Sequence, residues 1–339
     1  MSLNVQTQVS LKPYNSFGVD VYAARMVDAV NDAQLREALA YAAARELPVL
    51  VIGGGSNLLL TADVPGLVVR IASRGIRLLS EEAGRVIIEA EAGEPWHPFV
   101  LWTLEHGLAG LENLSLIPGT VGAAPMQNVG AYGVEIKDLF AGLTALDRST
   151  GELVEFGIAD CAFGYRESRF KRDPDRWVIL RVRFALSRAT VLHLEYGPVR
   201  QRLLEQGIAQ PTAKDVSAAI CSIRREKLPD PAVLGNAGSF FKNPVISAEQ
   251  AQGLKSSFPG LVSYAQADGQ VKLAAGWLIE QAGWKGYREG DAGVHDLQAL
   301  VLVNHGHASG SQLYALAQRI QADILQRFGV VLEMEPNRY

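Results

Sequence analysis

The 339-residue sequence has only two cysteines, Cys161 and Cys221, which stand far apart and form no C-x-x-C pair. A disulfide framework is therefore not indicated, and a reducing compartment fits. No stretch approaches the roughly 18 apolar residues that a membrane-spanning helix needs. The polar segment from Met1 to Pro13 lacks the apolar core of a signal peptide. We therefore expect a cytoplasmic protein with no membrane partner.

Charge of one sign is also scarce, since the net charge is −4 and no basic run occurs. The densest positive cluster consists of Arg224, Arg225 and Lys227. Three cations in four positions are too few for a nucleic-acid-binding face, but they suit one or two phosphates. We expect no nucleic-acid partner.

Metal-ligand patterns are equally sparse. His305-Gly306-His307 places two histidines together, but no third ligand follows at a convincing spacing. So short a motif matches by chance often. We predict no metal site.

Apolar residues make up 48% of the chain, and helical and strand patterns alternate, which predicts an α+β protein of two or three domains. Composition shifts place boundaries near residues 70 and 215. The expected helices cover residues 31–46, 198–206, 214–227, 272–282 and 309–328. The expected strands cover residues 49–52, 67–71, 85–91, 177–186, 300–303 and 330–335, with a hairpin over 143–156.

Glycine is abundant in two segments. Gly53-Gly54-Gly55-Ser56-Asn57 follows an apolar strand, where glycines let backbone amides approach a phosphate. The G-x-G-x-x-G pattern of dinucleotide folds is not met, because Leu58 occupies the third glycine position. A tight turn without a ligand is the alternative interpretation of this segment.

The second segment runs from Gly110 to Gly133 and is rich in glycine, proline and amide side chains. Such a backbone can lie flat against a planar ring or a pyrophosphate, and Thr120, Gln127 and Asn128 supply polar groups for it. A self-packed loop is the alternative. Two such segments in one chain favour a large nucleotide.

Ordered strings along nearly the whole chain resemble the UDP-N-acetylenolpyruvoylglucosamine reductase (MurB) family, also called UDP-N-acetylmuramate dehydrogenase, in its longer type with a substrate-loop tyrosine. They include Ile117-Pro-Gly-Thr-Val-Gly122, Phe163-Gly-Tyr-Arg-Glu-Ser168, Gly235-Asn-Ala-Gly-Ser-Phe-Phe-Lys-Asn-Pro244 and Leu332-Glu-Met-Glu335. The resemblance implies a non-Rossmann FAD-binding fold of the vanillyl-alcohol-oxidase type. It implies three domains: residues 1–70 joined by a C-terminal strand over 329–339, residues 71–214, and a substrate-binding domain over 215–328.

The resemblance also implies bound FAD as cofactor and NADPH as co-substrate. NADPH and the enolpyruvyl substrate would occupy one pocket in turn, and the protein would be a monomer. NADPH has no motif of its own in the sequence. The residues expected at FAD are Gly53, Gly54, Gly55, Ser56, Asn57, Ile117, Pro118, Gly119, Thr120, Gly122, Ala123, Gln127, Asn128, Gly130, Ala131 and Tyr132.

The family reaction reduces the enolpyruvyl ether of UDP-N-acetylglucosamine in peptidoglycan precursor synthesis. It needs positive charge at the substrate carboxylate and an acid for the neighbouring carbon. By resemblance, Arg166 and Glu335 stabilise the intermediate, and Ser239 donates the proton. From local sequence alone, a surface arginine, a turn serine and an edge glutamate are the alternatives. Met334 replaces the usual proline before Glu335.

The residues expected at the substrate are Tyr196, Arg224, Lys227, Asn243 and Gln298. The cations Arg224 and Lys227 also suit the C-terminal end of a helix, whose dipole favours positive charge.

Two other functions are also compatible with these residues. An oxidase of the same flavin fold would act on a sugar or alcohol, make hydrogen peroxide and need no NADPH. A non-catalytic nucleotide-sugar-binding module would not need Arg166, Ser239 or Glu335. The ordered set of strings favours the reductase over both.

Overall fold

The structure is a computed structural model that describes residues 3–189 and 191–339. The chain divides into two compact units. Unit 1 comprises the segment that ends at Val9 together with Ala23–Gly55 and Val64–Glu226, and unit 2 comprises Ser10–Tyr22, Ser56–Asp63 and Lys227–Tyr339. The finer division into three domains stays a prediction.

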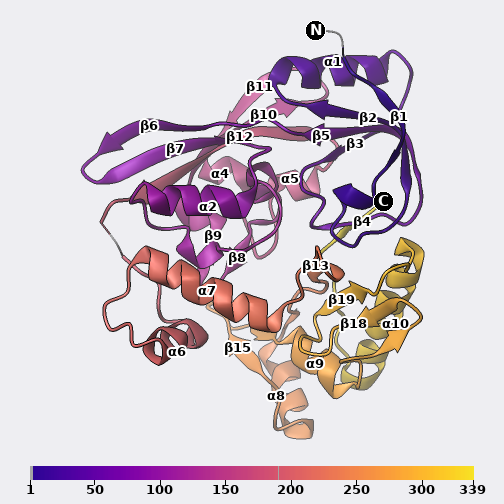
Figure 1. Ribbon diagram of the computed structural model, residues 1–339. Helices are drawn as coiled ribbons and strands as arrows, with labels where there is room; N and C mark the ends of the chain where they lie inside the picture. The colour runs from indigo at the N-terminus through magenta and orange to yellow at the C-terminus, as the bar shows by residue number, and fades with distance from the viewer. Residues whose placement is uncertain (1–2, 190) are drawn as a thin grey trace. The chain divides into compact units, whose positions relative to one another are not determined.

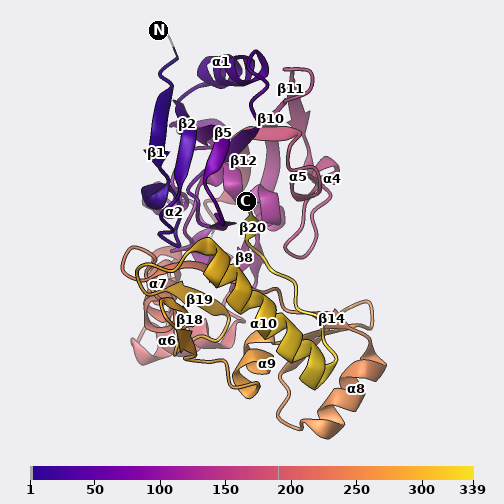
Figure 2. The ribbon, with the colours of Figure 1, turned by 90° about the vertical axis from the view of Figure 1, so that its right-hand side faces the viewer.

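The first sheet of unit 1 has the strand order β1-β2-β5-β3. Its strands are β1 (Gln6–Ser10), β2 (Tyr22–Ala29), β5 (Val64–Ile71) and β3 (Val49–Ile52), and β2 and β3 both run parallel to β5. Helix α1 (Asp32–Ala43) lies on this sheet (Figures 1 and 2) and buries Leu35, Ala38 and Ala42. Asn31 caps this helix, because its side chain accepts a 2.9 Å hydrogen bond from the amide of Gln34.

The second sheet of unit 1 is antiparallel, in the order β11-β10-β12-β7-β6. Its strands are β11 (Leu153–Phe156), β10 (Phe140–Asp147), β12 (Trp177–Ser187), β7 (Arg85–Glu91) and β6 (Ile76–Glu82). The predicted hairpin over 143–156 is confirmed by β10 and β11. Short strands β8 (Gly130–Ala131) and β9 (Val134–Glu135) pair separately.

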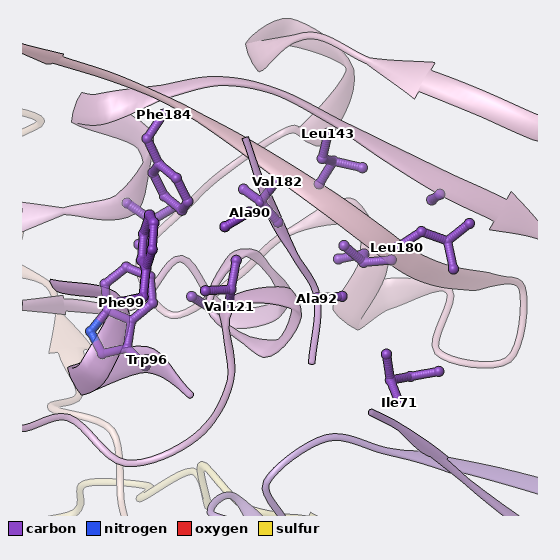
Figure 3. Packing of buried hydrophobic residues seen from close by; sticks show 14 of the residues in the cluster. Ile71, Ala90, Ala92, Trp96, Phe99, Val121, Leu143, Leu180, Val182 and Phe184 are labelled. Atoms are coloured by element: carbon purple, nitrogen blue, oxygen red, sulfur yellow. The ribbon is translucent and has the colours of Figure 1, made fainter. Parts of the chain in front are cut away.

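An aromatic group joins α2 (Trp96–Glu105) to the second sheet. Trp96, Phe99 and Phe184 are fully buried, with ring centroids 5.3 to 5.9 Å apart (Figure 3). Pro95 directly precedes this helix. Val121 belongs to the same core, so the glycine-rich segment is built on it.

The other helices of unit 1 are short except for one. They are η2 (Glu112–Leu114), η3 (Val121–Ala123), η4 (Pro125–Gln127), α3 (Ile136–Leu139), α4 (Ile158–Cys161), α5 (Arg169–Arg172), α6 (Gly197–Glu205) and α7 (Ala213–Lys227). A separate cluster packs α6 on α7 through Val199, Leu203, Val216 and Ile220.

Unit 2 has two small sheets, in the orders β13-β19-β18-β17 and β14-β16-β15, and the strand pair β20-β4. Figure 2 shows α10 (Gly310–Phe328) running along β18 and β19. Ser309 caps α10, and Gly329 ends it with φ +63°. The remaining elements are η1 (Lys12–Tyr14), β4 (Leu58–Leu59), β13 (Gly235–Ser239), β14 (Val245–Ile246), α8 (Ala248–Ser257), β15 (Ser263–Ala265), β16 (Val271–Leu273), α9 (Ala275–Gln281), β17 (Arg288–Glu289), β18 (Ala292–Val294), β19 (Val301–Asn304) and β20 (Asn337–Arg338).

Two predicted elements differ from the structure. The helix expected over 272–282 begins only at Ala275, because Val271–Leu273 pairs with two neighbouring strands. The strand expected over 330–335 is reduced to one bridge between Met334 and Phe241. Pro336 lacks the amide hydrogen that a continued ladder requires, and a two-residue strand follows it and pairs in parallel with β4.

Of the helices in residues 3–189 and 191–339, none has both the length and the apolar character to cross a bilayer.

Candidate active site

The two glycine-rich segments touch within unit 1. A methyl group added at Gly53 would lie 2.5 Å from Thr120 Oγ1, and one at Gly54 would lie 3.1 Å from the Cα atom of Gly119. Glycine at these two positions therefore lets the two segments pack directly against each other. Strand β4 follows Gly55, so no helix N-terminus serves a phosphate there.

The second segment is anchored to the connection between β7 and α2. The amide of Trp96 donates to the Gly119 carbonyl at 3.0 Å, and the amide of Gly122 donates to the Ala92 carbonyl at 2.9 Å. A methyl group on Gly122 would lie 2.4 Å from the Ala92 Cβ atom. Glycine at this position lets the segment lie directly on the core.

The rest of this segment contains several strained residues. Asn128 and Tyr132 have φ values of +42° and +50°, which non-glycine residues adopt rarely. The Asn128 side chain is directed into unit 1: its amide group donates to Glu135 Oε2 at 2.9 Å and to the Gly164 carbonyl at 3.0 Å. Both amide hydrogens that we had expected at FAD are therefore used within the protein.

Arg166 lies in the turn that follows Gly164 and also has a positive φ, +54°. Its Nη2 atom donates a 2.8 Å hydrogen bond to the carbonyl of Gly130. The structure thus brings Arg166 to the segment predicted to bind FAD. Strained residues of this kind often occur at functional sites.

Three residues predicted for different ligands form one cluster. The Tyr132 and Tyr196 rings pack edge to face with centroids 5.4 Å apart, and the Arg224 guanidinium lies close enough to the Tyr132 hydroxyl to affect its pKa. Burial raises the pKa of Tyr132, and Arg224 opposes this rise. Arg224 Nε also donates to the Leu116 carbonyl at 3.2 Å.

His97 is a neighbour of this cluster that the sequence did not reveal. Its Nδ1 atom accepts the amide hydrogen of Leu116 at 3.0 Å, so Nε2 carries the ring proton. Burial lowers the pKa of His97, and Arg225 and Arg224 lower it further. Leu116 has φ +58° and directly precedes Ile117, so a neutral His97 holds the start of the predicted FAD segment.

Ser239 ends β13 in unit 2 and is exposed. Asn236 pairs with Val303 and Ser239 with Val301, so β13 carries one extra residue and forms a bulge. Gly238, at φ +68°, gives its amide to the Asn236 side chain at 2.9 Å. Bulges re-aim side chains and are frequent next to active sites.

Glu335 is also in unit 2, on the segment bridged to the residues after Ser239. Glu335 is 8% exposed, whereas the side chain of Glu333 is 67% exposed and forms an ion pair with Lys242. The resemblance selected Glu335 over Glu333, and burial agrees with that choice. Asn57, expected at FAD, donates from its side chain to the Glu335 carbonyl at 3.3 Å.

Asn243 and Gln298 meet at the start of α9. Asn243 Oδ1 accepts the amide hydrogen of Ala275 at 2.9 Å, and a methyl group on Gly276 would lie 3.4 Å from Gln298 Oε1. Unit 2 therefore brings together two residues that were predicted to bind the substrate. Lys227, at the end of α7, is exposed.

The His305–His307 pair belongs to a turn. Asp291 accepts the backbone amides of both residues, at 2.8 and 2.9 Å. Within the described part of the chain, no group of three or more His, Cys, Asp or Glu side chains could hold a metal ion.

Comparison with known proteins agrees with this arrangement. Residues 23–157 match the FAD binding domain model, and residues 230–339 match the model for the UDP-N-acetylenolpyruvoylglucosamine reductase C-terminal domain. The first match lies in unit 1, apart from residues 56–63, and carries most of the glycine-rich residues; the second carries Ser239 and Glu335. The predicted FAD cofactor is thereby confirmed.

Relatives match over the whole length. UDP-N-acetylenolpyruvoylglucosamine reductase of Pseudomonas fluorescens is 73% identical, with 100% of each chain covered. The enzyme of Chromobacterium violaceum is 56% identical, with 99% of each chain covered. The crystal structure of the Thermus caldophilus reductase has a TM-score of 0.68 at 24% identity, covering 100% of both chains, and confirms the predicted α+β fold. The chain belongs to the UDP-N-acetylenolpyruvoylglucosamine reductase family.

Proposed function

We propose that this chain uses NADPH and bound FAD to reduce UDP-N-acetylglucosamine enolpyruvate to UDP-N-acetylmuramate, a step of peptidoglycan precursor synthesis in the cytoplasm. One observation carries the proposal: the chain is 73% identical, over its whole length, to the UDP-N-acetylenolpyruvoylglucosamine reductase of Pseudomonas fluorescens. Both an FAD-binding match and a reductase C-terminal match occur in one chain, which an oxidase or a binding module does not require.

The glycine-rich segments around Gly53 and Thr120 pack against each other, and both lie in the part of the chain that matches the FAD binding domain, so we assign FAD contact to them. When bound, FAD would supply the hydride-transfer chemistry between NADPH and the terminal carbon of the enolpyruvyl group. The protein binds, orients and polarises the reactants. We propose that NADPH and the enolpyruvyl substrate occupy the same place in turn.

Arg166 binds the substrate carboxylate in this proposal. Hydride addition moves negative charge toward that carboxylate, and a fixed, permanently charged guanidinium stabilises it. The Gly130 carbonyl occupies one guanidinium nitrogen and restricts its rotation. Pre-organisation of this kind lowers the free energy needed to orient the group during the reaction.

Ser239 delivers the proton to the neighbouring carbon, and Glu335 helps to stabilise the charged intermediate. The bulge in β13 leaves the Ser239 hydroxyl exposed. Within residues 3–189 and 191–339, no side-chain hydrogen bond holds this hydroxyl. Lys242, three residues after Ser239, hydrogen-bonds Glu333 through its Nζ atom.

Substrate specificity falls to Tyr196, Arg224, Lys227, Asn243 and Gln298. Lys227 offers an exposed ammonium group for a phosphate. Tyr196 covers substrate through its ring, which is half exposed and rests on Tyr132. Asn243 and Gln298 present amide groups near the start of α9 for a nucleotide.

An anaerobic turnover assay tests the proposal. Purified protein loaded with FAD is mixed with NADPH and UDP-N-acetylglucosamine enolpyruvate, and products are identified by mass spectrometry. The proposal predicts one UDP-N-acetylmuramate for each NADPH consumed. Peroxide formation from a sugar in air, without NADPH consumption, would instead identify an oxidase.

A further inference from the structure

The turn that carries Arg166 is a tight two-residue hairpin. Gly164 and Glu167 exchange backbone hydrogen bonds of 2.9 and 3.3 Å, and Tyr165 and Arg166 form its tip. Because Arg166 has φ +54°, the tip needs contacts from outside the turn to keep this conformation.

Three hydrogen bonds join the turn to the predicted FAD segment. They connect residues 164, 166 and 168 of the turn with residues 126, 128 and 130 of the segment. Ser168 Oγ donates to the Met126 carbonyl at 2.6 Å. Asn128 Nδ2 donates to the Gly164 carbonyl at 3.0 Å. Arg166 Nη2 donates to the Gly130 carbonyl at 2.8 Å.

Asn128 and Ser168, whose side chains donate two of these three bonds, are themselves held in place. Asn128 is 0% exposed and its Oδ1 atom accepts the amide hydrogen of Lys137 at 3.0 Å. Ser168 is also 0% exposed, and its hydroxyl caps α5 by accepting the amide hydrogen of Lys171 at 3.2 Å. A buried side chain with several bonds has few alternative positions, so each transmits a fixed geometry to its partner.

We propose that Asn128 and Ser168 are positioning residues that hold the Arg166 turn in register with the 126–130 segment. Neither acts on the reactants: Ser168 fixes the base of the turn, and Asn128 fixes its first residue. Together they leave the guanidinium one main orientation. This inference rests on the carboxylate-binding role proposed for Arg166.

The main test compares Ser168→Ala with Ser149→Ala in the FAD-loaded enzyme. Ser149 is a matched control, because its hydroxyl donates a 2.5 Å hydrogen bond to Asp147 in the β10–β11 turn of the same unit. Substrate affinity is measured from the flavin absorbance change when enolpyruvyl substrate is added to oxidised enzyme. Hydrogen exchange of the Gly164 and Glu167 amides reports the order of the turn.

We expect Ser168→Ala to weaken substrate binding about tenfold and to accelerate exchange at residues 164–168. The rate of flavin reduction by NADPH, expressed per bound flavin, should change less than twofold. Ser168→Thr, which keeps the hydroxyl and the cap, should restore the affinity. The inference is wrong if Ser168→Ala behaves like Ser149→Ala in affinity and exchange.

Two further variants keep the outcomes distinct. Asn128→Gly tolerates the positive φ and removes the side-chain bonds. It should therefore weaken substrate binding as Ser168→Ala does, and it replaces Ser168→Ala as the test if that variant does not fold. Arg166→Gln is the reference for the proposed function. If Arg166→Gln binds substrate normally, the carboxylate-binding role fails; if only Arg166→Gln binds weakly, the positioning inference alone fails.

Discussion

The backbone amide of Glu335 donates a 2.9 Å hydrogen bond to the carbonyl of Phe240, the residue that follows Ser239. A second bond of 2.9 Å joins the Lys242 amide to the Glu333 carbonyl. The two segments therefore share a fixed register within unit 2, and the residues assigned to protonation and charge stabilisation are tied through the main chain. The Asn57 side chain, bonded to the Glu335 carbonyl, adds a third attachment.

Glu335→Gln should lower turnover by about 10² or more, the usual range for loss of an acid–base or charge-stabilising group. The buried amide keeps the shape of the carboxyl but not its charge or proton. FAD absorbance should be unchanged, because the residues assigned to FAD contact are untouched. Steady-state kcat per bound flavin measures the effect.

Glu333→Gln is the control for this variant. It changes an equally charged residue two positions away, whose exposed side chain pairs with Lys242. The Lys242 side chain is only 9% exposed, so loss of its partner should lower stability. Turnover per bound flavin should stay within threefold of wild type, because the Glu333 carboxylate is assigned no role in the reaction. A loss as large as that of Glu335→Gln would contradict the assignment of Glu335.

Gly122→Ala should lower FAD content and stability. The new methyl group would lie 2.4 Å from the Ala92 Cβ atom, where neither backbone can yield freely. Overpacking costs about 1–3 kcal/mol. The ratio of flavin to protein absorbance and the thermal midpoint measure both effects.

Gly253→Ala provides the comparison. Gly253 lies in α8, and a methyl group there meets nothing within 4 Å. Alanine should stabilise this helix by about 0.5–1 kcal/mol, with full FAD content. An equal FAD loss in both variants would refute a specific role for the close approach at Gly122.

The sequence predicted most elements whose local signals agree with their packing. Asn31 and Ser309 begin helices where capping predicts, and Gly329 ends one. Segments governed by distant partners were harder to predict. Val271–Leu273 fits a helix pattern, but its backbone bonds go to strands that are distant in sequence.

The candidate site divides in the same way. Glycine spacing and the family resemblance found the FAD segments and Arg166. The sequence could not show which of Glu333 and Glu335 is buried, because a regular strand would place both side chains on the same face. The hydrogen bond of the Asn128 side chain to Gly164 and that of His97 to Leu116 join residues that are distant in the sequence. No sequence pattern predicts either bond.

His97→Asn should make the enzyme less sensitive to acid. Burial and the nearby Arg225 and Arg224 lower the pKa of folded His97, so the unfolded chain binds a proton first as the pH falls. Stability from neutral His97 is complete above the unfolded pKa of about 6.5 and is lost as the pH falls toward the lowered pKa of the folded state. Asparagine keeps an acceptor for the Leu116 amide but does not titrate.

Thermal midpoints at pH 7.5 and 5.5 measure this effect. The wild-type midpoint should fall by about 2 °C more than that of His97→Asn over this interval. Equal falls would show that His97 is not held neutral in the folded enzyme.

Tyr196→Ala should raise the KM for the enolpyruvyl substrate about tenfold, because the ring that rests on Tyr132 is lost. Tyr264→Ala is a suitable control, since Tyr264 is 51% exposed and Tyr196 is 50% exposed. Steady-state kinetics with each substrate varied separately distinguishes the two. An unchanged KM in Tyr196→Ala would remove this tyrosine from the substrate site.

The most direct test of the central claim is an anaerobic stopped-flow experiment on the FAD-loaded protein. Addition of NADPH should bleach the flavin absorbance, and subsequent addition of UDP-N-acetylglucosamine enolpyruvate should restore it. Restoration by that substrate, with UDP-N-acetylmuramate formed in equal amount, is the predicted result. Bleached protein that recovers its colour only with oxygen, or protein that cannot be loaded with FAD, would contradict the assignment.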